Sequence, residues 1–163
     1  MSKSSTRIVG IDPGTGILGF GVIEYDGQNC QLVDGGVIKT PVKEDDVVRL
    51  QTIFEELQDI IAQTDPTEMA VEKLFFAQNV TTAMTVSQAR GVAMLAGAQA
   101  GLKVSEYTPQ QIKQAITGYG KAEKAQIQEM VRIILKLKTI PKPDDCADAL
   151  ACAITHAFSL RVK

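Results

Sequence analysis

The sequence is poor in the residues that build disulfide frameworks and zinc sites. Its 163 residues include 3 cysteines and 1 histidine. The cysteines Cys30, Cys146 and Cys152 form no CxxC pair, and the histidine does not stand at a zinc-ligand spacing from them. We therefore expect neither a disulfide scaffold nor a zinc site, and this use of cysteine favours a reducing, cytoplasmic location.

Long apolar runs and low-complexity stretches are also missing. Residues 1–7 are polar and no apolar signal segment follows them, and no uninterrupted apolar run approaches the roughly 20 residues that span a bilayer. We expect no membrane attachment. A chain of 163 residues with 45% hydrophobic content can bury one core, so residues 1–163 are predicted to form a single domain, with residues 1–6 as a flexible tail.

The chain lacks the basic excess that nucleic-acid-binding proteins usually show, since its formal net charge is −2. This sum hides an asymmetry. Residues 1–100 carry 7 Lys+Arg against 13 Asp+Glu, whereas residues 101–163 carry 10 against 6. A fold that brings the basic half beside a few acids would present a phosphate-binding rim around an acidic site. The alternative from the counts alone is two mixed, solvated faces.

Hydrophobic periodicity and turn residues predict a mixed α/β order. Apolar runs separated by Pro-Gly and Asp-Gly turns predict three antiparallel strands, and helical spacing with an Asp-Pro stop predicts the first helix. The expected strands are residues 7–12, 18–25, 31–39, 68–74 and 103–107. The first expected helix runs from residue 47 to the stop at Asp65-Pro66, and the others are residues 80–100, 109–117, 122–137 and 144–160. Three antiparallel strands followed by βα units predict a ribonuclease-H-like fold with a five-stranded mixed sheet flanked by helices.

Two carboxylates stand at the ends of predicted strands. Asp12 ends the first strand and Glu72 lies near the end of the fourth. Ligands bind at strand ends in open α/β sheets, so these positions are candidate site residues. An Asp before Pro-Gly is also a common turn residue, so neither position is decisive alone.

The last predicted helix supplies a second acidic pair. Asp145 and Asp148 are three residues apart and therefore share one face of an otherwise apolar helix. Two unit charges about 4 Å apart repel by about 4 kcal/mol at an effective dielectric constant near 20, a cost that a proton or cation would relieve. The alternative is that Asp144 and Asp145 stabilise the helix start, which leaves Asp148 unexplained.

Together the four carboxylates predict a metal-dependent nuclease. Hard oxygen ligands without His or Cys suit Mg²⁺, with Mn²⁺ as a substitute, and two such ions about 3.5–4 Å apart suit in-line attack of water on a phosphodiester. His156 lies two helical turns, roughly 12 Å, beyond Asp148, so we expect it to be a structural or surface residue rather than a ligand.

Five blocks of the sequence resemble one known family, the RuvC Holliday-junction resolvases, in order and spacing. These blocks are GIDPGTGILGFGVIE (10–24), AVEKLFFAQN (70–79), SQARGVA (87–93), the IK…GYGKAEKAQIQEMV stretch (112–131) and DDCADALACAITHA (144–157). The resemblance covers nearly the whole chain. It implies a DNA endonuclease that resolves Holliday junctions, four-way DNA junctions, by paired symmetric nicks in recombination and repair.

The resemblance also implies roles for individual residues. Asp12, Glu72, Asp145 and Asp148 match the family's metal ligands and catalytic acids, although some members have histidine at the position of Asp145. By the same resemblance, Phe75 is the aromatic residue that stacks on bases, and Lys113 and Lys124 contact phosphates. From the sequence itself, Phe75 or its neighbour Phe76 could equally be core, and both lysines could be solvated. A buried helix seldom tolerates an unpaired guanidinium, so Arg90 is expected to join either the acidic site or a partner helix, and it receives no more specific role.

Partners follow from the same resemblance. A junction is nearly two-fold symmetric and needs two symmetric cuts, so we expect a homodimer, with the apolar helix 80–100 as its candidate surface unless that helix is buried within one subunit. The family also implies a branch-migration complex of RuvA and RuvB type. Alternative functions are a ribonuclease-H-like nuclease acting on RNA or other branched DNA, and a catalytically silent junction-binding module.

Overall fold

A computed structural model describes residues 4–14, 16–73 and 80–162 of the chain. The described strands are β1 (Thr6–Asp12), β2 (Ile17–Tyr25), β3 (Cys30–Lys39), β4 (Glu68–Glu72) and β5 (Lys103–Tyr107). They form one five-stranded sheet in the order β3-β2-β1-β4-β5. β1, β2 and β3 pair antiparallel, whereas β4 runs parallel to both β1 and β5. This confirms the predicted mixed sheet and places β1 at its centre.

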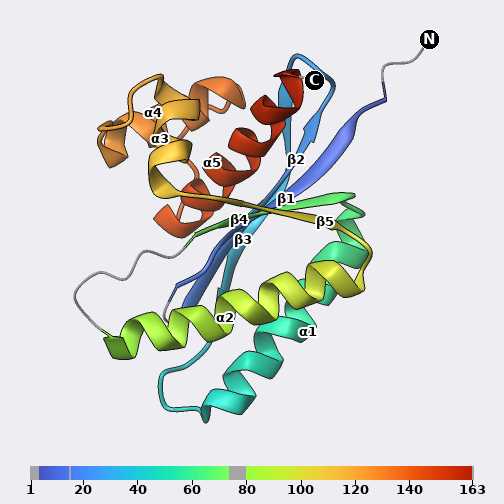
Figure 1. The fold of residues 1–163 in the computed structure, drawn as a ribbon, viewed down its shortest axis with the longest axis vertical. Coiled ribbons are helices and arrows are strands. Elements are labelled where there is room, and N and C mark those ends of the chain that lie inside the picture. The colour runs from blue at the N-terminus through green and yellow to red at the C-terminus, as the bar shows by residue number, and fades with distance from the viewer. Residues whose placement is uncertain (1–3, 15, 74–79, 163) are drawn as a thin grey trace.

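Helices cover both faces of the sheet (Figure 1). One layer contains α1 (Asp46–Thr64) and α2 (Val80–Gln99). The opposite layer contains α3 (Pro109–Thr117), α4 (Lys124–Ile134) and α5 (Asp144–Ser159), which continues into the short 3-10 helix Leu160–Val162. Successive residues of β1 alternate between the layers, since Ile8 packs on the α5 side and Val9 on the α1 side. The sheet therefore separates two apolar cores.

Local signals set the ends of the helices. α3 begins at the predicted residue because the Thr108 hydroxyl accepts from the Gln111 backbone N–H, and the Gln111 side-chain oxygen accepts from the Thr108 backbone N–H. α4 begins two residues later than predicted because Glu123 forms the corresponding cap with Gln126. Among the described residues, no helix is long and apolar enough to cross a membrane.

The helix α5 lies in backbone contact with the sheet. A Cβ atom on Gly10 of β1 would stand 2.1 Å from the carbonyl oxygen of Ala149, and one on Gly19 of β2 would stand 2.0 Å from that of Asp145. Any other residue at these two positions would overlap the helix backbone. The strand glycines therefore let α5 approach the sheet more closely than an ordinary side chain would permit.

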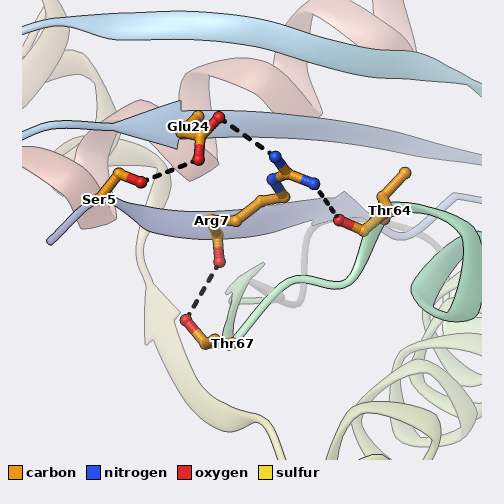
Figure 2. Close-up of polar contacts among 5 residues, drawn as sticks. All are labelled: Ser5, Arg7, Glu24, Thr64 and Thr67. Atoms are coloured by element: carbon orange, nitrogen blue, oxygen red, sulfur yellow. Dashed lines mark hydrogen bonds and ion pairs between the residues drawn. The ribbon is translucent and has the colours of Figure 1, made fainter.

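An arginine ties the start of β1 to its surroundings (Figure 2). Arg7 donates to Glu24 of β2 at 3.2 Å and to the Thr64 carbonyl oxygen at the end of α1 at 2.7 Å. Ser5 donates to the same Glu24 at 2.9 Å, and the Thr67 backbone N–H donates to the Arg7 carbonyl oxygen at 2.9 Å. The predicted tail of residues 1–6 therefore overlaps the first strand by one residue, because Thr6 belongs to β1.

Candidate active site

The central strands bring two of the predicted acids side by side. Ile11 pairs with Val71 across the parallel β1 and β4 ladder, so Asp12 and Glu72 occupy the next positions at the same sheet edge. Neighbouring strands lie about 4.8 Å apart, which puts the two carboxyl groups within reach of each other. Both residues are half-buried. The alternative of a simple turn residue does not account for an Asp12 that faces a second acid.

The helix α5 delivers the other two acids to this edge. Asp12 pairs with Gly19 of β2, and the Asp145 backbone lies directly against Gly19. Asp148 follows one turn later and is half-buried. The close approach of helix and sheet therefore sets the spacing between the strand acids and the helix acids.

Burial and mutual repulsion disturb the titration of this cluster. Burial, followed by the nearby charges of Glu72 and Asp148, raises the pKa of Asp12 from 3.8 to about 9. Burial also raises the pKa of Glu72. A hydrogen bond from Asp12 and the positive charges of Lys113 and Lys124 lower this pKa and so partly offset the rise. The pKa of Asp148 is raised for the same first reason, with Lys124 opposing the rise. The cluster therefore favours binding a proton or a cation.

Two lysines and two of these acids line one hollow of about 210 Å³. Its lining combines two acids, two bases and apolar helix residues: Glu72, Asp148, Lys113, Lys124, Pro109, Ile112, Ile127 and Ala151. The basic second half of the chain thus supplies a wall beside acids from both halves. This arrangement fits the predicted phosphate-binding rim better than two mixed solvated faces.

Lys124 is paired with acids of α5. Its Nζ lies 3.3 Å from Asp144 and 3.7 Å from Asp148. Within the described part of the chain, no three His, Cys, Asp or Glu side chains are close enough to form a ready-made metal site. The donor set still fits a hard divalent cation, because it consists of carboxylates whose raised pKa values reflect uncompensated burial. Coordination would require these side chains to draw together.

Other predicted residues have different outcomes. Phe75 and Phe76 lie outside the described residues. His156 is buried on α5, where its Nδ1 shares a 2.7 Å hydrogen bond with the Tyr107 hydroxyl and its Nε2 lies 3.2 Å from Glu68. That Nε2 makes no hydrogen bond among the described groups. These contacts fit the predicted structural role for His156.

Reasoning from the sequence missed two features of the site. Gly10 and Gly19 permit the close approach of α5, and the only local signal for this was glycine inside apolar strands. The second feature is the set of contacts made by Arg90 of α2, for which the sequence left the acidic site and a partner helix as alternatives. Its Nε donates to the carbonyl oxygen of Glu72 at 3.3 Å, and its Nη2 pairs with Glu106 of β5. No local pattern in the sequence could have identified that pairing.

The sheet is mixed and has the strand order β3-β2-β1-β4-β5. Acids lie at the adjoining ends of β1 and β4, beside the acidic residues at the start of α5. These features define an α/β protein of the ribonuclease-H-like class. The family model described as crossover junction endodeoxyribonuclease RuvC matches residues 8–156. The chain belongs to the RuvC family. A RuvC from Heliobacterium modesticaldum is 58% identical over 94% of both chains, and one from Brevibacillus brevis is 57% identical over 93% of this chain and 91% of its own.

Comparison with solved structures also finds RuvC proteins. The chain is similar to Thermus thermophilus RuvC, with a TM-score of 0.90, 39% identity and 96% of both chains covered. It is equally similar to Thermus thermophilus RuvC in complex with Holliday junction substrate, with a TM-score of 0.91. A yeast mitochondrial Holliday junction resolvase shares the fold at 11% identity, with a TM-score of 0.70.

Proposed function

We propose that this protein is a Holliday-junction resolvase that hydrolyses phosphodiester bonds by paired symmetric nicks, in DNA recombination and repair. The observation that carries the proposal is the acidic cluster of Asp12, Glu72 and Asp148 beside a lysine wall, in a chain of the RuvC family. The relatives named above are crossover junction endodeoxyribonucleases, and one similar structure holds a Holliday junction.

The cofactor follows from the donor set. We infer two Mg²⁺ ions per site, held by Asp12, Glu72, Asp145 and Asp148, with Mn²⁺ as a functional substitute. When bound, such ions lower the pKa of a coordinated water and stabilise charge on the phosphate. The protein holds two ligands on rigid strand ends and two on α5, so the spacing between helix and sheet sets the width of the site.

The lysines have a complementary part in this proposal. Lys113 and Lys124 line the same hollow as Glu72 and Asp148, so a DNA phosphate entering it meets positive charge beside the acids. Lys124 then exchanges its ion pair with Asp148 for one with phosphate, and the carboxylate becomes free for coordination. From the family resemblance alone, Phe75 is proposed to stack on an unpaired base.

A homodimer supplies the two cuts. On α2, Met84 is 60% exposed and Leu95 is 51% exposed, and a Cβ atom on Gly91 between them would meet nothing within 4 Å. A glycine inside a helix costs about 0.5–1 kcal/mol relative to alanine, and no contact with the described residues requires it here. A second subunit approaching this face would account for both observations. The alternative of a helix buried on all sides within one subunit does not fit these exposures.

Two further proposals rest on the family alone. We propose that the resolvase acts on junctions processed by a branch-migration complex of RuvA and RuvB type, and that it works in the cytoplasm. Co-sedimentation of the protein with RuvA-bound and RuvB-bound junction, compared with junction alone, would test the first of these. Absence of a shift under conditions that support cleavage would contradict it.

The central experiment compares substrates. The protein is incubated with Mg²⁺ and a synthetic four-way junction, a linear duplex of the same sequence, or an RNA–DNA hybrid. We expect symmetric nicks in the junction alone, and none with the Asp148→Asn variant. Preferred cleavage of the hybrid would favour a nuclease acting on RNA, and junction binding without any cleavage would favour a silent binding module.

A further inference from the structure

Arg90 connects α2 to the strand end that carries Glu72. Its Nε donates to the Glu72 carbonyl oxygen at 3.3 Å, while its Nη2 pairs with Glu106 on the neighbouring strand. The Arg90 side chain is 19% exposed, so its charge is largely withdrawn from solvent. We propose that Arg90 is a positioning residue, which holds the end of β4 so that Glu72 keeps its place in the acidic cluster.

The end of β4 needs such support. The recorded pairing with β1 stops at Val71, whereas Glu72 pairs with Tyr107 of β5. The Lys73 backbone N–H donates to the Tyr107 carbonyl oxygen at 2.7 Å, which holds the chain from the β5 side. Arg90 reaches the same peptide from α2. The carboxylate of Glu72 is therefore aimed by contacts on its own backbone.

The chemistry of the contact favours arginine. Glu106 stands in register with Val71, one residue before Glu72, so one guanidinium can serve a carboxylate and a carbonyl on adjacent strands. The rigid, planar fork of arginine presents several donors in fixed directions, whereas a lysine ammonium acts as a point charge. Both recorded contacts of Arg90 are used within the protein, which favours a positioning role over contact with DNA.

The chain contains a matched control for this arrangement. Arg7 also pairs with a glutamate on the neighbouring strand, Glu24, and also donates to a backbone carbonyl oxygen, that of Thr64 (Figure 2). Arg7 is five residues before Asp12 on β1, about 16 Å away along the strand. Loss of either arginine removes the same kinds of contact, but only Arg90 touches a residue of the acidic cluster.

The test compares Arg90→Gln with Arg7→Gln. Single-turnover cleavage of a four-way junction is measured against Mn²⁺ and Mg²⁺ concentration, at a temperature where circular dichroism shows every variant folded. We expect Arg90→Gln to raise the metal concentration for half-maximal cleavage at least tenfold, with partial recovery at saturating Mn²⁺. Arg7→Gln should leave that concentration within twofold of the wild type, even where its urea midpoint falls.

Two more variants keep the test decisive. Glu106→Gln retains an acceptor but loses the charge, so we expect an intermediate shift of about threefold, which also serves if Arg90→Gln does not fold. Arg90→Lys should restore less than half of the shift on a logarithmic scale. The inference would be overturned if Arg90→Gln showed the metal dependence of the wild type. If Arg90→Gln fails to fold, the same result in Glu106→Gln would overturn it. So would a loss of metal-free junction binding in Arg90→Gln, which would make Arg90 a DNA contact.

The inference rests on the proposed function, because it takes Glu72 to be a metal ligand. Glu72→Gln is therefore assayed beside the other variants. Cleavage by Glu72→Gln at the wild-type rate would overturn the proposed site itself. An inactive Glu72→Gln together with a wild-type metal dependence for Arg90→Gln would leave the proposed site intact and overturn only the role of Arg90.

Discussion

Replacing Asp12 with asparagine should stabilise the metal-free protein while abolishing cleavage. Burial and the charges of Glu72 and Asp148 raise the pKa of Asp12 to about 9, so ionising this group opposes folding. Asparagine has nearly the same shape and can donate to Glu72 without ionising. The variant therefore loses a ligand and, at the same time, a source of electrostatic strain.

The sign and size follow from proton linkage. Between the unfolded pKa of 3.8 and the folded pKa of about 9, the folded state binds more protons than the unfolded state, so wild-type stability falls as pH rises. The slope is at most about 1.4 kcal/mol per pH unit, which sets a ceiling of about 4 kcal/mol on the Asp12→Asn gain at pH 7. Hydration of the open hollow reduces this, and we expect a gain of about 1–2 kcal/mol.

Urea unfolding in EDTA at pH 6, 7 and 8 measures the effect. The wild type should lose stability across this series, whereas Asp12→Asn should show a flatter profile and a higher midpoint at pH 8. Asp59→Asn, which removes an exposed carboxylate from α1, is the matched control and should change stability by no more than about 0.5 kcal/mol. Adding Mg²⁺ at about 100 times its Kd should stabilise the wild type by about 2.7 kcal/mol for each ion bound, and the Asp12 variant by much less.

Two results would refute this reasoning. If Asp12→Asn were less stable than the wild type at pH 8 without metal, Asp12 would be contributing favourable contacts rather than repulsion. If Mg²⁺ stabilised the variant and the wild type equally, Asp12 would not be a ligand. Cleavage at a near wild-type rate would independently exclude Asp12 from the site.

Three further predictions concern other parts of the molecule. Gly19→Ala should destabilise the protein by about 1–3 kcal/mol and reduce cleavage at least tenfold, because its Cβ would overlap the α5 backbone. Gly120→Ala is the control, since its Cβ would meet only the side chains of Gln110 and Gln114 at 3.4 Å or more, and equal thermal midpoints for the two variants would contradict this prediction. Leu95→Arg should shift sedimentation equilibrium at micromolar concentration from dimer to monomer, and a wild-type that is itself monomeric would refute the dimer. Lys113→Ala and Lys124→Ala should each reduce the slope of log binding affinity for the junction against log salt concentration by about one unit. An unchanged slope together with unchanged cleavage would show that neither lysine contacts DNA phosphate.

Local patterns predicted most of the fold. Strand β5 and helix α3 have the predicted bounds because Thr108-Pro109 is a strong local start signal. Helix α4 begins later than predicted, at Lys124, because the periodicity of apolar residues does not show which acidic or polar residue forms the cap. Helix ends depend on single side-chain contacts, and periodicity is insensitive to them.

The candidate acids were also recognisable from the sequence, unlike the contacts that support them. Asp12 and Glu72 stand out because a charge at the end of an apolar strand needs a reason, and Asp148 because it lies inside an apolar helix. The pairing of Arg90 with Glu106 joins residues from different elements, and a sequence does not state which elements meet. The ion pairs of Lys124 were hidden for the same reason.

The backbone contact between α5 and the sheet has a consequence for how this protein can change during evolution. Where side chains separate a helix from a sheet, substitutions such as Ile to Val or Leu let the layers drift by fractions of an ångström. At Gly10 and Gly19 no side chain intervenes, so peptide groups touch directly. The separation between the strand acids and the helix acids is then fixed by the size of the peptide group itself, and the surrounding core is free to vary without altering it.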